Sequence, residues 1–117
     1  MTARNKLLTA PPYAVEQTLK RLGANLRTAR LRRNLTIADM AEKIGTGERA
    51  VADAEKGKPS TSIAVYAAML WALDLLDQIA DVAAPEKDDE GQTLALSRER
   101  ARARPTAGTK TRLDNDF

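Results

Sequence analysis

The segment from Thr36 to Glu55 constrains the fold most, because it predicts two short helices joined by a tight turn. Thr36 and Thr46 each stand where a hydroxyl can cap the free N–H groups at the start of a helix. Gly45, between them, can adopt the positive φ that a sharp turn requires. Apolar residues recur at helical spacing in both halves, namely Ile37, Met40, Ala41, Ile44, Val51 and Ala54. The two helices are therefore expected to share one small core.

Two structures are consistent with this pattern, an ordinary helical hairpin and a helix-turn-helix. Ala41, Ala50 and Ala54 are small enough for the two helices to cross closely, which favours the helix-turn-helix. Cap, turn, spacing and residue size all agree with it, and a natural fold shows this agreement across levels. In a helix-turn-helix the second helix faces outward, as proteins that read DNA require.

A longer run of residues extends this signal on both sides of the motif. It comprises Leu22-Gly23, Leu26, Arg27, Arg30, Leu35-Thr36, Ala41, Ile44-Gly45-Thr46, Val51, Glu55-Lys56-Gly57-Lys58-Pro59, Ala67, Leu70 and Ala72-Leu73-Asp74. With these residues in order and without gaps, positions 22 to 73 resemble the Cro/repressor-like helix-turn-helix domains of the XRE class. The resemblance covers slightly under half of the chain, and it is more specific to the fold than to one biological role.

Helical periodicity and helix-breaking residues predict an all-α chain in three parts. Residues 1–13 are a flexible, basic N-terminal arm, residues 14–84 are a five-helix Cro/repressor-like DNA-binding domain, and residues 85–117 are an acidic linker with a flexible, arginine-rich tail. The expected helices cover residues 15–33, the two short segments of the motif, a fourth segment ending at Leu73, and a fifth over 75–82 capped by Asp74.

Composition limits both the core and the chemistry. A chain of 117 residues holds one domain with a modest core, and with 3% aromatic residues its packing depends on aliphatic side chains. The sequence has no Cys and no His, so we expect no catalytic site, no metal and no cofactor. It also lacks an apolar run long enough to span a bilayer or to act as a signal segment, so we expect a cytoplasmic protein without membrane contact.

Charge is segregated along the chain. Residues 1–35 contain eight Lys or Arg and one acid, a net charge of +7, whereas residues 74–90 contain seven acids and one Lys, a net charge of −6. A basic arm and first helix attract a polyanion, while the acidic segment would be repelled by it. One face of the molecule is therefore expected to meet double-stranded DNA.

The resemblance assigns DNA contacts to the second short helix and its surroundings. The side chains at the start of this helix would enter the major groove, where Arg49 could bond O6 and N7 of guanine, and Lys56 and Lys58 would reach phosphates. The implied DNA-binding residues are Thr36, Thr46, Gly47, Glu48, Arg49, Ala52, Lys56 and Lys58.

Several residues depart from the family pattern at this surface. Ile37 stands where the family usually has a phosphate-contacting Gln, and Gly47 and Glu48 replace the polar amides usual at the helix start. Asp53 adds another carboxylate. A carboxylate beside phosphates is unfavourable unless it accepts a specific bond, as Glu48 would from cytosine N4.

Two residue pairs carry structural expectations. The resemblance implies that Arg30 and Glu55 face each other, since a guanidinium can hold a carboxylate with two hydrogen bonds; the alternative is two solvated surface charges. Tyr66 and Trp71 are five residues apart on the fourth helix, so one of them should point outward. That residue would either cover a loop or form, with the fifth helix, the seam of a two-fold homodimer.

The last third of the chain is similar, more weakly, to HipB-like antitoxins, which partner HipA-type kinases. The acidic linker Asp88–Gly91 and an arginine-rich stretch carry this similarity. Four arginines stand at alternate positions of this stretch, namely Arg98, Arg100, Arg102 and Arg104. In an extended segment they would lie along one side, where they could bind a partner.

We therefore expect a non-enzymatic, homodimeric repressor that binds an inverted repeat in its own operon. More specifically, we expect this repressor to be an antitoxin that neutralises a HipA-type kinase. A stand-alone regulator is an alternative. Another is a protein-binding adaptor whose helix-turn-helix no longer reads DNA, which Ile37, Glu48 and Asp53 favour.

Overall fold

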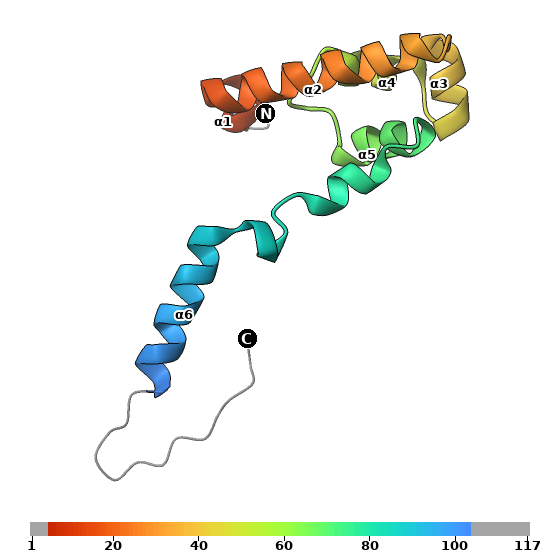
Figure 1. The fold of residues 1–117 in the computed structure, drawn as a ribbon. Coiled ribbons are helices and arrows are strands. Elements are labelled where there is room, and N and C mark those ends of the chain that lie inside the picture. Colours follow the sequence, from red (N-terminus) through yellow and green to blue (C-terminus); the bar gives the residue numbers. More distant parts are fainter. Residues whose placement is uncertain (1–4, 104–117) are drawn as a thin grey trace. The chain divides into compact units, whose positions relative to one another are not determined.

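The computed structural model describes residues 5–103, and in this range the chain is all-α, without a β-strand (Figure 1). It divides into two compact units at Ala80 and Asp81. The first unit contains α1 (Lys6–Thr9), α2 (Tyr13–Arg32), α3 (Ile37–Ile44), α4 (Glu48–Glu55) and α5 (Ile63–Ala72). A 3₁₀ helix, Leu76–Asp81, follows; the second unit then contains a 3₁₀ turn, Pro85–Lys87, and α6 (Asp89–Ala103).

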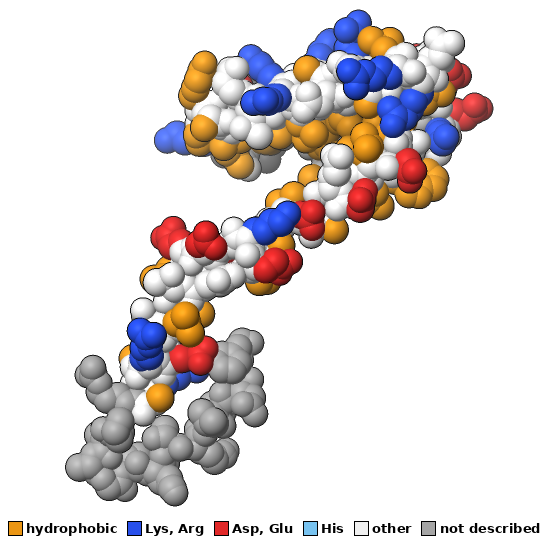
Figure 2. Space-filling model, in the orientation of Figure 1, with side chains coloured by type: hydrophobic (Ala, Val, Ile, Leu, Met, Phe, Trp, Pro, Cys, Tyr) orange, Lys and Arg blue, Asp and Glu red, His pale blue; other side chains and the backbone are white. Residues whose placement is uncertain are grey.

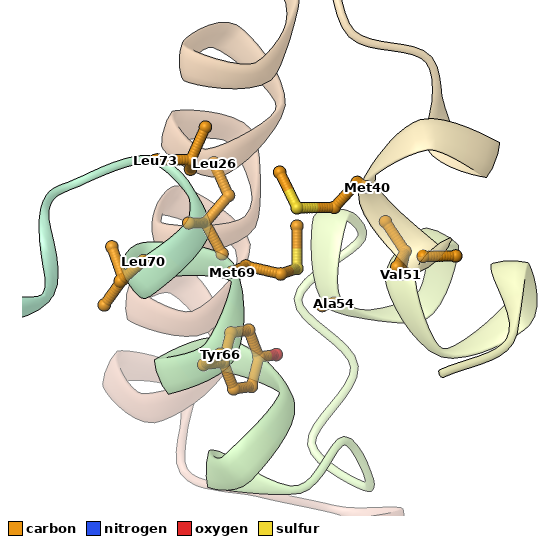
Figure 3. Close-up of a cluster of buried hydrophobic side chains, with 9 residues drawn as sticks. Leu26, Met40, Val51, Ala54, Tyr66, Met69, Leu70 and Leu73 are labelled. Carbon is orange, nitrogen blue, oxygen red and sulfur yellow. The ribbon is translucent and has the colours of Figure 1, made fainter. Parts of the chain in front are cut away.

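The core of the first unit is built from the four helices α2 to α5 (Figure 3). Helix α3 packs against α4 and α5, and α4 also packs against α2. The apolar periodicity of the motif predicted the inner faces of α3 and α4, and the structure confirms their most buried members. The buried apolar residues of the cluster are Leu26, Met40, Ala41, Val51, Ala54, Tyr66, Met69, Leu70 and Leu73.

The helix starts use different caps. At α3, the Thr36 hydroxyl accepts from the Asp39 N–H at 2.9 Å while the Asp39 carboxylate accepts from the Thr36 N–H at 2.9 Å, which is a complete capping box. The expected cap at Thr46 is wrong: α4 begins at Glu48 after Gly47, with no side-chain cap. The Thr46 N–H donates to the Ala41 carbonyl at 3.0 Å and so closes the end of α3.

The ends of four helices share one backbone conformation. Within two residues of the ends of α2, α3, α4 and α5 lies a residue with positive φ, and the N–H of the residue after it donates back into the last turn of the helix. Gly45, with φ of 79°, fills this position after α3 as the sequence indicated. Asp74, with φ of 63°, fills it after α5, so its expected role as the cap of a following helix is wrong.

Gly23 and Gly57 let α2 and the end of α4 approach closely. A Cβ at Gly23 would lie 2.6 Å from the carbonyl oxygens of both Ala54 and Glu55. Gly57, with φ of 69°, lies directly against the Leu19 carbonyl of α2. The backbone that follows α4 is therefore fixed against α2.

Two segments near the ends of the domain differ from expectation. The arm contains a short helix, α1, in which the Asn5 side chain accepts from the Leu7 N–H at 2.9 Å; residues 1–4 of the arm lie outside the described residues. The expected α-helix over 75–82 is a 3₁₀ helix, Leu76–Asp81. Aspartates at positions 74, 77 and 81 explain this, since like charges three or four residues apart destabilise an α-helix and Asp has a low helix propensity.

The predicted linker and tail are helical up to Ala103. The Asp88 carboxylate accepts from the Gly91 N–H at 2.9 Å, acids occupy the first turn of α6, and arginines occupy its last turn, which suits the helix dipole. Arg98 and Arg102 then share a face while Arg100 points elsewhere, because alternate residues of an α-helix are about 200° apart. The expected extended row of arginines is therefore wrong, and Arg104 lies outside the described residues.

Candidate nucleic-acid interface

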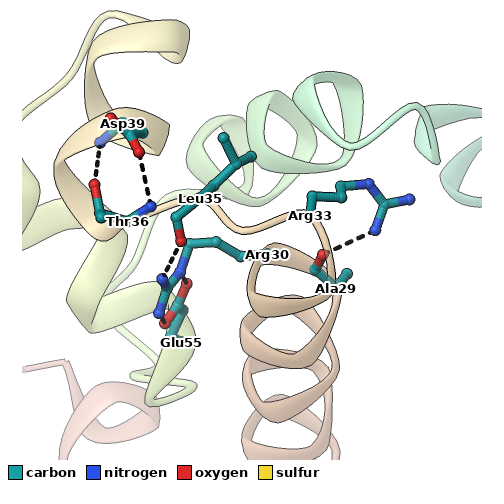
Figure 4. A network of polar contacts seen from close by, with 7 residues as sticks. All are labelled: Ala29, Arg30, Arg33, Leu35, Thr36, Asp39 and Glu55. Atoms are coloured by element: carbon teal, nitrogen blue, oxygen red, sulfur yellow. Dashed lines mark hydrogen bonds and ion pairs between the residues drawn. The ribbon is translucent and has the colours of Figure 1, made fainter.

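A buried ion pair joins α2 to the end of α4 (Figure 4). The structure brings Arg30 of α2 and Glu55 of α4 together through two hydrogen bonds, Nε to Oε2 at 2.6 Å and Nη2 to Oε1 at 2.9 Å. A third bond, from Nη1 to the Leu35 carbonyl at 2.7 Å, ties the pair to the segment before α3. The side chains are only 6% and 5% exposed.

This pair favours the charged form of Arg30. The pKa of Arg30 is raised because its side chain donates to the Glu55 carboxylate, an effect that outweighs the opposing desolvation by burial. A planar guanidinium with two parallel bonds fixes orientation as well as distance. The ends of α2 and α4 and the start of α3 are therefore held as one rigid frame.

At the start of α3, the N–H groups of Thr36 and Asp39 are already hydrogen-bonded to side chains of the chain itself. The Thr36 N–H and hydroxyl both lower the pKa of Asp39 through hydrogen bonds, so this carboxylate stays ionised as a cap. Thr36 is exposed, but its hydroxyl is already engaged with Asp39. Ile37 follows it and is half-buried against the core.

The first turn of α4 is the most open part of the motif. Gly47, Glu48 and Arg49 are exposed, whereas Thr46 and Ala52 are half-buried. A Cβ at Gly47 would meet nothing within 4 Å. Within residues 5–103, Arg49 makes no side-chain hydrogen bond or ion pair, so its guanidinium is available to a ligand. Glu48 borders an open hollow of about 530 Å³ with Thr36 and Ile37.

The loop after α4 contains an ion pair that sequence reasoning missed. Lys58 Nζ lies 3.1 Å from Asp53 Oδ1, so the carboxylate treated above as a liability for DNA binding has a partner within the chain. Lys56 is exposed and makes no ion pair within the described residues. The five-residue spacing across the end of α4 is the only signal in the sequence that could have indicated the pair.

Basic side chains gather over α2, as Figure 2 shows. Its one acid, Glu16, is half-buried, while the basic residues outside the core are exposed. They are Lys20, Arg21, Arg27, Arg32 and, directly after the helix, Arg33. Arg33 also donates from Nη2 to the Leu73 carbonyl at 3.1 Å, which links the ends of α2 and α5.

Helix α5 is apolar on all sides, including its exposed side. Each of its ten residues is apolar or aromatic without charge. Tyr66 is buried, but Ile63 is 68% exposed and Trp71 is 58% exposed. The expectation that one of the two aromatics points outward is confirmed, and that residue is Trp71. A helix that is hydrophobic all round is normally buried, so this side lacks its usual cover in the single chain.

Within residues 5–103, no group of three or more acidic residues is placed to hold a metal ion, and no helix is long and apolar enough to cross a membrane. Comparison with curated proteins and with solved structures finds no match. A family model described as a helix-turn-helix domain matches residues 21–82, which is more than half of the chain and includes the ion pair, the motif and α5. The chain belongs to this family of helix-turn-helix domains, whose architecture is that of a DNA-binding regulator.

Proposed function

We propose that the protein is a transcriptional repressor that binds double-stranded DNA sequence-specifically as a homodimer. The observation that carries the proposal is the exposed first turn of α4, where Arg49 has no partner within the described residues and the Arg30–Glu55 pair holds the backbone rigid. A preorganised helix start with an available guanidinium suits bidentate recognition of guanine in the major groove. Lys56 and Lys58 would contact the flanking phosphates.

The proposed dimer uses the exposed side of α5. Two half-sites one helical turn apart require a protein with two-fold symmetry. Ile63 and Trp71 lie about two turns apart along α5 and expose large apolar surfaces. Pairing α5 with its copy would bury both, which supports α5 as the interface.

Selection from a library of randomised duplexes tests the function. The full chain is expected to enrich an inverted repeat, and the same repeat should occur in the DNA upstream of its reading frame. Affinity for the selected duplex should fall with salt at a log–log slope of roughly −4 to −7, because about five to eight phosphate contacts release counterions. If no sequence were enriched, the result would contradict a repressor. It would favour the alternative of a protein-binding adaptor, which Ile37 and Glu48 support.

A second function rests on the unit after Ala80. Helix α6 has no buried residue, and it exposes Leu94 and Leu96 by 61% and 52%. A helix with exposed leucines and arginines suits a protein partner. If the repressor is also an antitoxin, we propose that α6, with Arg98, Arg100 and Arg102, binds a HipA-type kinase. Co-purification with the product of the neighbouring reading frame tests it.

A further inference from the structure

The backbone N–H and carbonyl of Lys58, in the loop after α4, are both hydrogen-bonded. Its N–H donates to the Asp53 carbonyl at 3.1 Å. Its carbonyl accepts from the Thr61 N–H at 3.0 Å and from the Tyr66 hydroxyl at 3.4 Å. Because Gly57 also lies against the Leu19 carbonyl of α2, the backbone at Lys58 has little room to shift.

The Lys58 side chain is held as well. Its ammonium lies 3.1 Å from Asp53 Oδ1, and the two side chains are 44% and 25% exposed. An ammonium has three donors, so the bond to Asp53 leaves two of them open to solvent. Lys56, two residues earlier, is exposed and has no such partner within the described residues.

We propose that Asp53 is a positioning residue for DNA binding: it holds the Lys58 ammonium so that the remaining donors meet a backbone phosphate. This inference rests on the DNA-binding function proposed above. A lysine has a long flexible stem, and ordering it at the moment of binding costs conformational entropy. With Asp53 in place, that cost is met when the chain folds rather than when DNA binds.

The carboxylate also has an opposing effect, because it repels phosphates. The two effects have opposite signs and depend differently on Lys58. If positioning dominates, removing the Asp53 charge weakens DNA binding when Lys58 is present and strengthens it when Lys58 is absent. If repulsion dominates, removing the charge strengthens binding in both backgrounds.

The test is a double-mutant cycle on the full chain with Asp53→Asn, Lys58→Met and the combination. Affinities are measured for the duplex recovered by selection and for a scrambled duplex of the same composition. We expect Asp53→Asn alone to weaken binding to both duplexes by about threefold or more, and to lower the salt slope. In the Lys58→Met background, the same change should strengthen binding.

Two further variants keep the result interpretable. Asp53→Glu retains the charge and should bind within about twofold of the unaltered chain. Glu42→Gln removes an exposed acid of α3 that has no ion pair within the described residues, and it should bind equally or more tightly. Thermal unfolding of each variant verifies that the fold is intact.

Tighter binding by Asp53→Asn in both backgrounds, or weaker binding by the same factor in both, would overturn the positioning role alone. If the unaltered chain bound neither duplex, the proposed function would fall, and this inference with it.

Discussion

At the scale of single residues, the Arg30–Glu55 pair connects three parts of the helix-turn-helix domain. It joins α2, α4 and the entry to α3 with side chains that are 6% and 5% exposed. Breaking such a pair leaves one buried charge without compensation, whereas removing both charges does not. The pair is therefore better understood as a device that fixes orientation than as a large net source of stability.

Arg30→Leu and Glu55→Leu should each lower the free energy of unfolding by about 3–5 kcal/mol, because each leaves the other charge buried and unpaired. The double variant should lose less than the sum of the two. Urea denaturation measures all three. Arg27→Leu, which removes an exposed arginine of the same helix, is the control and should change stability by less than about 0.5 kcal/mol. Additive losses in the double variant would show that the two residues act separately.

Local sequence rules succeeded at some residues and failed at others for physical reasons. Thr36 and Gly45 were predictable because a capping box and a positive φ depend on residues close in sequence. Thr46 was misplaced as a cap because the N-cap of α4 is the next residue, Gly47, and α4 begins at Glu48. The Asp53–Lys58 pair was missed because it depends on how the chain turns after α4 rather than on helical spacing.

At the scale of elements, α5 combines a buried side and an exposed apolar side. Because α5 is apolar on all sides, its sequence has no periodicity that distinguishes the buried side, and the spacing of Tyr66 and Trp71 predicted only that one of the two points outward. The 3₁₀ helix after α5 was predicted as an α-helix from the spacing of its apolar residues. That prediction gave no weight to the three aspartates at positions 74, 77 and 81, which disfavour an α-helix. Helix α6 was mistaken for linker and tail because it has no apolar stripe, although its alanines, leucines and arginines favour helix formation.

Trp71→Lys should convert the proposed dimer to a monomer, because a charge on the exposed apolar side of α5 would be buried in the interface. Sedimentation velocity measures the change. Leu31→Lys, which replaces an apolar residue of α2 that is 49% exposed, is the matched control and should leave the mass unchanged. DNA affinity should fall in the Trp71 variant, because the dimer is lost, and should not fall for that reason in the Leu31 variant. A Trp71→Lys protein that stays dimeric would place the interface elsewhere.

At the scale of the whole molecule, the chain separates a compact helix-turn-helix unit from a second unit that carries α6. Charge does not follow this division, since the basic excess lies before residue 36 and the acidic excess over 74–90 includes residues of both units. The all-α class was predictable from the sequence. The identity of α6 as a separate helical element was not, because it depends on caps and dipole rather than on a core.

A chain that ends at Glu90 lacks nearly all of α6 and should retain the fold and most of its DNA affinity, because no residue of α6 is buried. It should lose any protein partner. Circular dichroism, DNA titration and co-purification with the neighbouring gene product measure these three properties. Loss of dimerisation by the shortened chain would instead make the C-terminal unit part of the dimer.

The central claim, that the start of α4 reads DNA bases, is tested most directly by comparing Arg49→Ala with Lys58→Ala. Each variant is titrated against the selected duplex and a set of single base-pair substitutions of it. Arg49→Ala should lose about 1–3 kcal/mol of discrimination at one base pair per half-site, whereas Lys58→Ala should weaken binding to all duplexes alike. Discrimination that is unchanged in Arg49→Ala, or lost in Lys58→Ala, would contradict this account of the interface.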